Sequence, residues 1–139
     1  MMQFLCYNTL KVNMKLIIAG SREFDDYDYL VKVLKNSNLI NTVEEVVCGM
    51  ARGADLLGQR WAEEHNIPVK EFPADWNSYG KRAGFIRNEQ MAYYGTTSLI
   101  FWDGLSRGSK HMIGISRKVG LPTYVINYKQ QQLGLNDEF

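Results

Sequence analysis

Short, continuous apolar runs recur along the chain, and each ends at a glycine, a proline or another turn residue. The three strongest runs cover residues 16–19, 45–48 and 99–102. Continuous runs, rather than alternating apolar and polar positions, are typical of parallel strands that are covered on both faces. A more polar run over residues 68–72 predicts an edge strand, and residues 123–126 predict a fifth strand.

Apolar positions at helical spacing occupy the intervals between these runs. They predict helices over about residues 27–39, 54–66 and 109–119, and residues 84–94 are also predicted to be helical, with a mixed periodicity. Regular alternation of strands and helices is typical of α/β proteins. We therefore expect a single α/β domain: a doubly wound, mainly parallel five-stranded sheet flanked by helices.

The length of 139 residues fits one domain with its own hydrophobic core. We expect an N-terminal extension over residues 1–13, the domain over residues 14–128 and a polar C-terminal tail over residues 129–139. The first residues lack the apolar stretch of a signal peptide, and nothing approaches the roughly 20 apolar residues that cross a bilayer. These patterns predict a cytoplasmic protein with no membrane partner.

Charge, cysteines and histidines narrow the chemistry. The formal net charge of +1 argues against nucleic acid as a partner held by bulk electrostatics. Cys6 and Cys48 make no disulfide framework, which suits a reducing compartment. His65 and His111 have no second ligand at metal-binding spacing, so no metal site is predicted.

Glycines, serines and arginines gather where three predicted strands end. In an open parallel sheet, ligands bind at these carboxyl ends. Glycines permit close backbone approach, and helix N-termini attract phosphate. One such loop alone is as well explained by a tight turn, but three together favour an anion or nucleotide pocket. The standard dinucleotide and P-loop motifs are absent, so neither of those enzyme classes is supported.

The loop after the third predicted strand, residues 72–84, carries Trp76 and Tyr79 beside Lys81 and precedes Arg87. Its aromatic side chains could stack on a base, and its cations could contact phosphate or carboxylate. The alternative is a loop that packs on itself, with Trp76 as its plug and Asp75 paired to an arginine.

The candidate ligand-binding residues come from these four segments. They are Gly20, Ser21, Arg22, Gly49, Arg52, Gly53, Ala54, Asp55, Asp75, Trp76, Tyr79, Lys81, Arg87, Asn88, Asp103, Gly104, Ser106, Gly108 and Ser109.

Four motifs resemble one family in order and spacing. They are G-S-R-x-F-x-D at residues 20–26, G-x-A-x-G-A-D at 49–55, A-D-W-x-x-Y-G-K-x-A-G-x-x-R-N at 74–88 and W-D-G-x-S-x-G-S-x-x-M-I at 102–113. They are similar to the YspA-like, cpYpsA-related branch of the SLOG superfamily. This resemblance implies a Rossmann-like sheet that binds nucleotides or nucleotide-derived ligands at its strand ends. Relatives include LOG phosphoribohydrolases and DNA-processing Smf/DprA proteins.

The resemblance leaves catalysis open. The position of the LOG catalytic glutamate falls on Met112, which cannot stabilise an oxocarbenium-like centre or activate water. Three hypotheses follow. The first is a module that senses or sequesters a nucleotide-type ligand, with no further cofactor implied. The second is an N-glycoside hydrolase in which Arg87, Asp103 and Glu89 are catalytic. The third is an Smf/DprA-like DNA-handling protein.

The resemblance also favours a homodimer or a higher homo-oligomer. Helix faces that carry Trp61, Tyr93 and Tyr94 could provide the apolar contact surface. The alternative is that these aromatic side chains pack inside the domain, as the core of a monomer also requires.

Overall fold

A computed structural model of the chain describes residues 14–37 and 39–129. The predicted N-terminal extension, and the predicted tail beyond Lys129, lie outside the described residues. The described part holds one fully parallel sheet of five strands in the order β3-β2-β1-β4-β5. The strands are β1 (Met14–Gly20), β2 (Val43–Cys48), β3 (Val69–Glu71), β4 (Thr97–Trp102) and β5 (Thr123–Asn127).

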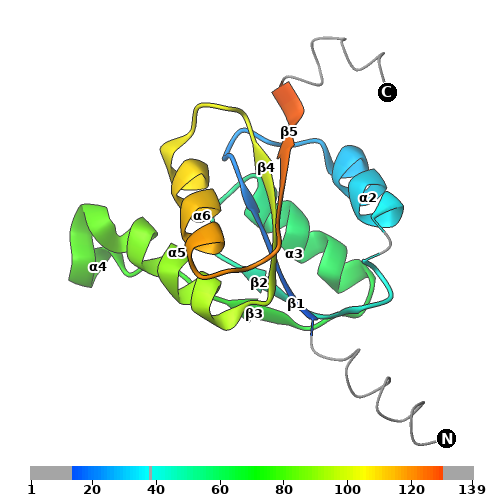
Figure 1. Cartoon of the computed structure of the whole chain (residues 1–139), viewed down its shortest axis with the longest axis horizontal. Coiled ribbons are helices and arrows are strands. Elements are labelled where there is room, and N and C mark those ends of the chain that lie inside the picture. The colour runs from blue at the N-terminus through cyan, green and yellow to red at the C-terminus, as the bar shows by residue number, and fades with distance from the viewer. Residues whose placement is uncertain (1–13, 38, 130–139) are drawn as a thin grey trace, which may run out of the picture.

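Helices cover both faces of this sheet (Figure 1). α2 (Tyr27–Asn36) and α3 (Ala54–Glu64) pack on one face, and α5 (Ala83–Tyr94) and α6 (Arg107–Lys118) pack on the other. In β1, Leu16 and Ile18 face the first pair of helices, whereas Ile17 and Ala19 face the second pair. Burial on both faces explains why the central strands read as continuous apolar runs. The Rossmann-like, doubly wound α/β prediction is confirmed.

The strand order places a switch point beside β1. From β1 the chain proceeds to β2 and then to β3 at one edge; it next crosses to the other side of β1 and forms β4 and β5. β3 is an edge strand, as its polar sequence predicted. Crevices at the carboxyl ends of strands on either side of such a switch point are the usual ligand sites of open α/β sheets. Here those strands are β1 and β4.

Several predicted helix boundaries shift by a few residues. α2 ends at Asn36 rather than near residue 39, because the Ser37 backbone N–H and hydroxyl bond to the carbonyl oxygens of Val33 and Leu34 and close the last turn. α3 ends at Glu64 rather than at 66, where Asn66 takes a left-handed φ of 57°. α6 begins at Arg107, two residues earlier than predicted.

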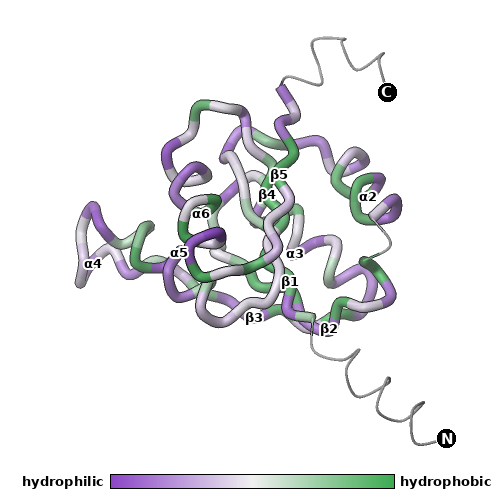
Figure 2. Tube along the Cα trace, viewed as in Figure 1, coloured by the Kyte–Doolittle hydropathy of each residue, from purple (hydrophilic) through white to green (hydrophobic). Residues whose placement is uncertain are grey.

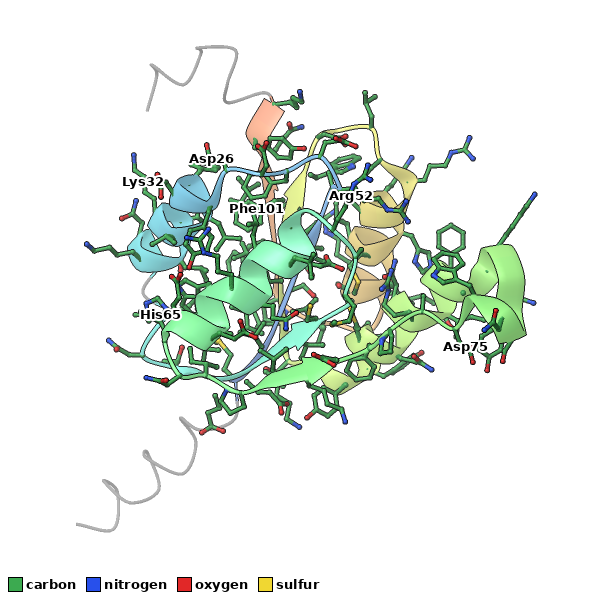
Figure 3. All side chains as sticks on the ribbon, turned by 180° about the vertical axis from the view of Figure 1, so that it is seen from behind. Asp26, Lys32, Arg52, His65, Asp75 and Phe101 are labelled. Atoms are coloured by element: carbon green, nitrogen blue, oxygen red, sulfur yellow. The ribbon has the colours of Figure 1, made fainter. Side chains whose placement is uncertain are left out.

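The segment predicted as a long loop before α5 contains two short helical elements. They are α4 (Trp76–Tyr79) and the 3-10 turn η1 (Gly80–Arg82). The Asp75 carboxylate accepts a hydrogen bond from the Ser78 backbone N–H (3.1 Å) and caps α4. α4 projects from the body of the domain (Figure 1), with Asp75 on this projection, away from the sheet (Figure 3). Trp76 is 51% exposed, so the alternative that it plugs the loop is wrong.

The apolar positions concentrate in the sheet and on the inner sides of the helices (Figure 2). Phe24 stacks on Phe101 with ring centroids 4.7 Å apart, and Tyr128 contacts Phe24 just after β5. Trp61 is 1% exposed and belongs to this core, so its predicted role on an oligomer surface is wrong. None of the helices among the described residues is long and apolar enough to cross a membrane.

Candidate functional site

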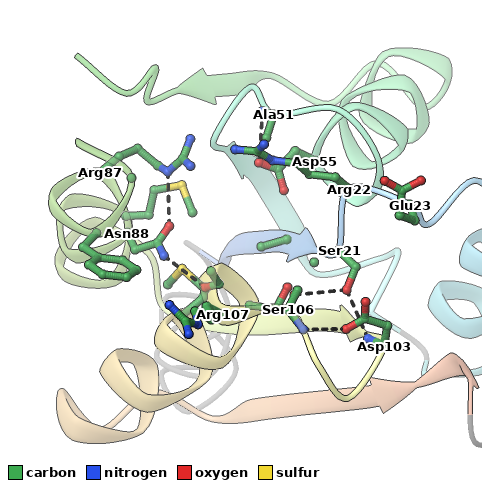
Figure 4. Close-up of a pocket in the computed structure, with 18 of the residues that line it drawn as sticks. Ser21, Arg22, Glu23, Ala51, Asp55, Arg87, Asn88, Asp103, Ser106 and Arg107 are labelled. Atoms are coloured by element: carbon green, nitrogen blue, oxygen red, sulfur yellow. Dashed lines mark hydrogen bonds between the residues drawn. The ribbon is translucent and has the colours of Figure 1, made fainter. Parts of the chain in front are cut away.

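A cavity of about 430 Å³ lies at the carboxyl ends of β1 and β4, at the switch point (Figure 4). We call it the main cavity. Its lining residues come from the end of β1, from the loops after β1, β2 and β4, from the first turn of α3, from α4 and η1, and from α5 and α6. They are Ala19, Gly20, Ser21, Arg22, Glu23, Ala51, Asp55, Trp76, Lys81, Gly84, Phe85, Arg87, Asn88, Met91, Asp103, Ser106, Arg107, Gly108, Ser109 and Met112.

The loops after β1 and β4 are tied together at the floor of this cavity. The Asp103 backbone N–H donates to Ser21 Oγ (3.1 Å), which lies 3.3 Å from Ser106 Oγ. Gly20 passes directly against the Phe101 carbonyl, where a Cβ atom would collide with it. A glycine is therefore needed here, because only the bare backbone leaves room for the contact between β1 and β4.

Asp103 holds the shape of the loop that leads into α6. Its Oδ1 accepts hydrogen bonds from the backbone N–H groups of Leu105 and Ser106, each at 2.8 Å. Desolvation acts to raise the pKa of Asp103, but these bonds outweigh it, and the pKa falls below its usual value. An ionised carboxylate that already accepts two backbone bonds is suited to fixing a turn rather than to donating a proton.

The N-terminus of α6 faces the cavity with no acidic residue in its first turn. Ser106 stands at the N-cap position, but its side chain makes no capping hydrogen bond. The first turn contains Arg107 and Lys110 and no acidic residue. Cations are unfavourable at the positive end of a helix dipole. This arrangement therefore favours an external anion at the α6 N-terminus.

The Ser109 hydroxyl is a second observation that favours a ligand at the α6 N-terminus. The side chain lines the cavity and is 5% exposed, yet its hydroxyl has no hydrogen-bond partner within the described part of the chain. Buried polar groups are almost always paired, so an unpaired hydroxyl requires an explanation. A ligand oxygen at the α6 N-terminus would supply the missing partner.

The other two helices that follow the predicted loops differ from α6 at their N-termini. Asp26 caps α2 by accepting a bond from the Tyr29 backbone N–H (3.0 Å), and α2 begins six residues after Ser21, outside the cavity. α3 also lacks a side-chain cap, but its Ala54 backbone N–H donates to the Ser21 carbonyl (3.4 Å) and its first turn carries the acidic Asp55. Of the three helix N-termini that the sequence offered as phosphate positions, the N-terminus of α6 is therefore the best candidate.

Arg87 and Asn88 connect α5 to both flanking loops. Arg87 Nη1 donates to the Gly49 carbonyl, and its Nε donates to Asn88 Oδ1 (3.1 Å). Asn88 Nδ2 in turn lies 3.3 Å from the Gly108 carbonyl and 3.1 Å from His111 Nδ1. A chain of contacts thus runs from the loop after β2 to the first turn of α6. Asn88 is buried, so it fixes the orientation of Arg87.

Asp55 is the buried acid of the site. Its Oδ2 accepts a bond from the Ala51 backbone N–H (3.2 Å). Burial raises the pKa of Asp55 to about 6, against the opposing influence of Arg87. Burial also lowers the pKa of Arg87, although the Asp55 charge partly offsets that effect. A Cβ at position 49 would lie 2.7 Å from Arg87 Nη1 and 2.8 Å from Asp55 Oδ2, so a side chain there would displace these two groups.

An exposed aromatic wall borders the cavity on the side of α4 and α5. Trp76 and Phe85 are 51% and 45% exposed, and both line the cavity beside Lys81. The Phe85 ring also packs on the His111 ring, with centroids 4.4 Å apart. Flat aromatic surfaces next to a cation are suited to a planar, anionic ligand.

Most of the sequence-predicted residues meet in or beside this cavity. Gly49 and Arg52 line a neighbouring cavity of about 340 Å³, which we call the side cavity. Five predicted ligand residues line neither cavity: Gly53, Ala54, Asp75, Tyr79 and Gly104. The predicted catalytic Glu89 is exposed and also lines neither.

Other lining residues were not among the predicted ligand residues, chiefly Ala19, Glu23, Ala51, Phe85, Met91 and Arg107. Arg107 carried a usable signal, because a basic residue in a first helical turn is unexpected. Ala19, Ala51 and Met91 carried none, since their place in the wall depends on packing. Within residues 14–37 and 39–129, no three His, Cys, Asp or Glu side chains come close enough to share a metal ion.

Comparison with known proteins fits this geometry. Residues 14–79 match the family described as YspA, cpYpsA-related SLOG. The Gene 61 protein of Mycobacterium phage D29 is 36% identical over an alignment of 126 residues, and the match covers 82% of this chain and 95% of that protein. The chain belongs to the YspA, cpYpsA-related SLOG family. The relative aligns over a stretch far longer than residues 14–79, so the similarity extends past the first half of this SLOG domain.

A solved structure shares the fold of the SLOG chain. The X-ray structure of DNA processing protein A (DprA) from Streptococcus pneumoniae superposes with a TM-score of 0.54 and 16% sequence identity. The match covers 90% of this chain but 62% of that DprA chain. The likeness therefore concerns the arrangement of helices and strands.

Proposed function

We propose that this SLOG domain binds a nucleotide or nucleotide-derived ligand in the main cavity, with a phosphate group at the N-terminus of α6. The observation that carries the proposal is the unpaired Ser109 hydroxyl beside an uncapped helix N-terminus. Backbone N–H groups and the helix dipole favour phosphate at such a position. The α6 dipole and the Ser109 hydroxyl would act on the same ligand oxygens.

The charges around the cavity support an anionic ligand. Arg22, Lys81, Arg87 and Arg107 line it, against the carboxylates of Glu23, Asp55 and Asp103. Burial raises the pKa of Asp55 and so favours its neutral form, and the Asp103 carboxylate is engaged by backbone N–H groups. Four cations thus face three carboxylates, one of which is engaged by backbone N–H groups, and this balance favours an anionic ligand.

The shape of the cavity supports a nucleotide. Its volume of about 430 Å³ lies in the range of roughly 300–1,000 Å³ that is usual for small-molecule sites. The Trp76 and Phe85 rings offer a stacking surface for a base. Ser21 and Arg22, at the end of β1, would contact a ribose hydroxyl.

A binding role rather than catalysis follows from the carboxylates. Met112, in place of the glutamate that the resemblance implies, is buried and lines the cavity. Glu89 lies outside it, and Asp103 is committed to its loop. We therefore propose a module that senses or sequesters its ligand.

Calorimetry on the full chain tests this function. Purine mononucleotides, NAD and ADP-ribose form the panel, and Arg107→Gln is compared with Arg117→Gln at the other end of α6. We expect micromolar binding of at least one compound, weakened about tenfold in Arg107→Gln and unchanged in Arg117→Gln. Failure of the whole panel to bind would refute the proposal.

Hydrolysis of an N-glycosidic bond is the second candidate, and Asp55 favours it. A carboxylic acid with a pKa of about 6 that lines the cavity is suited to general acid–base work near neutral pH. Chromatography for free base, after incubation with nucleoside monophosphates or NAD, tests this candidate. Base release that disappears in Asp55→Asn would establish it over simple binding.

DNA handling is favoured by one surface feature. Trp76 and Tyr79 are exposed beside Lys81 and Arg82 on the projecting α4 segment, and base–aromatic stacking next to cations is a common mode of single-strand binding. The shared fold with DprA is consistent with this candidate. A salt-dependent mobility shift with single-stranded DNA that is lost in Trp76→Ala would support it.

A further inference from the structure

The side cavity has an unusual balance of charge. It lies at the carboxyl end of β2 and is lined by Arg22, Gly49, Met50, Ala51, Arg52, Pro73, Ala74, Trp76 and Arg87. Three arginines line it, and no carboxylate does so among the described residues. Three guanidinium groups around one hollow repel one another unless an anion lies between them.

Each of the three arginines has N–H groups that are available to a ligand. Arg22 makes no hydrogen bond or ion pair within the described part of the chain. Arg87 is half-buried, and its two bonds to Gly49 and Asn88 use neutral acceptors and leave further N–H groups of its guanidinium. Arg52 pairs with Glu23 at 2.9 Å, but both side chains are about 70% exposed. Such exposed ion pairs contribute little and are easily exchanged.

The side cavity adjoins the main cavity. Arg22, Ala51, Trp76 and Arg87 line both, so these residues form the boundary between the two hollows. Arg22 and Arg87 can each present N–H groups to either side. A ligand bound at the α6 N-terminus can therefore extend past these two arginines into the side cavity.

We propose that the side cavity is a second anion subsite, and that the ligand carries two separated phosphate groups, one for each cavity. The inference rests on the proposed function, because it takes the first phosphate to lie at the α6 N-terminus. Arg52 releases its ion pair with Glu23 and contacts the second phosphate instead. A guanidinium can hold phosphate through two parallel N–H bonds, which makes arginine well suited to this role.

Calorimetry with matched nucleotides tests the second subsite. The probes are the 3′,5′- and 2′,5′-bisphosphates of adenosine and guanosine, compared with AMP and GMP. We expect at least one bisphosphate to bind the wild-type chain tenfold or more tightly than its monophosphate. Arg52→Gln should reduce this ratio to below threefold, mainly by weakening the bisphosphate. Arg60→Gln, which breaks another exposed pair (Arg60–Glu64, 3.1 Å) on α3, should leave the ratio unchanged.

Glu23→Gln separates a ligand role of Arg52 from a merely structural one. If Arg52 only holds Glu23 in place, Arg52→Gln and Glu23→Gln break the same ion pair. Both substitutions then change the ratio of bisphosphate to monophosphate affinity in the same direction. If Arg52 holds phosphate, removal of the Glu23 charge frees it, and the ratio rises while Arg52→Gln lowers it. Equal affinities for monophosphates and bisphosphates would overturn the second subsite and leave the proposed function standing. Absence of all nucleotide binding would overturn both.

Discussion

Arg87 shows how one residue can join several parts of the site. Its bonds reach the loop after β2 and, through Asn88, the first turn of α6. The sequence placed Arg87 among the ligand residues through the motif that it shares with the family. It could not show that Arg87 borders two cavities, because that depends on the fit of α5 against the Gly49 loop.

Asp55 carries a prediction on pH. Burial raises its pKa in the folded state from an ordinary 3.8 to about 6, with Arg87 and Arg22 acting in the opposite direction. Between about pH 4 and 6 the folded chain therefore keeps a proton that the unfolded chain has lost. Linkage then requires that the contribution of Asp55 to stability decline as pH rises through this window.

The substitution Asp55→Asn should remove that decline, which is of the order of 2 kcal/mol for a shift of this size. We expect the variant to show a smaller loss of unfolding free energy than the wild type between pH 4.5 and pH 7. Urea unfolding of both proteins at pH 4.5 and at pH 7 measures this loss of unfolding free energy. An identical pH dependence in the two proteins would show that Asp55 does not titrate in this way.

At the scale of elements, the sequence predicted the strands better than the loops. The continuous apolar runs identified β1, β2 and β4, because burial on both faces leaves a pattern that can be read locally, and weaker runs identified β3 and β5. The segment between β3 and α5 lacked such a pattern, and its short helices depend on local capping such as that by Asp75. Helix ends shifted for the same reason.

The contact between α5 and α6 carries a prediction of its own. Asn88 is 6% exposed and its side chain contacts Arg87, the Gly108 carbonyl and His111. Asn88→Ala leaves these groups without their partner, so we expect a loss of about 1–3 kcal/mol in unfolding free energy. We also expect weaker nucleotide binding, since both Arg87 and the first turn of α6 lose their brace.

Chemical unfolding and calorimetry measure the two effects of Asn88→Ala. Gln90→Ala, at an exposed position two residues further along α5, is the matched control and should change neither quantity. Wild-type stability and affinity in Asn88→Ala would contradict the bridging role.

At the scale of the whole molecule, the fold brings residues far apart in the sequence to one edge of the sheet. Sequence analysis predicted this edge from the loops after β1, β2 and β4. It could not rank those loops, because the difference between them lies at the N-termini of the helices that follow. Asp26 caps α2, the first turn of α3 carries Asp55, and the first turn of α6 carries no acidic residue. The structure thereby narrows a general expectation of nucleotide binding to a phosphate position.

The most direct test of that position is an NMR titration of the ¹⁵N-labelled full chain with the nucleotide that binds in calorimetry. Phosphate at the α6 N-terminus predicts large, saturable downfield shifts of the backbone N–H signals of Gly108 and Ser109. The Tyr29 N–H, which Asp26 already caps, should stay in place. Saturable binding that leaves Gly108 and Ser109 unshifted would contradict the account.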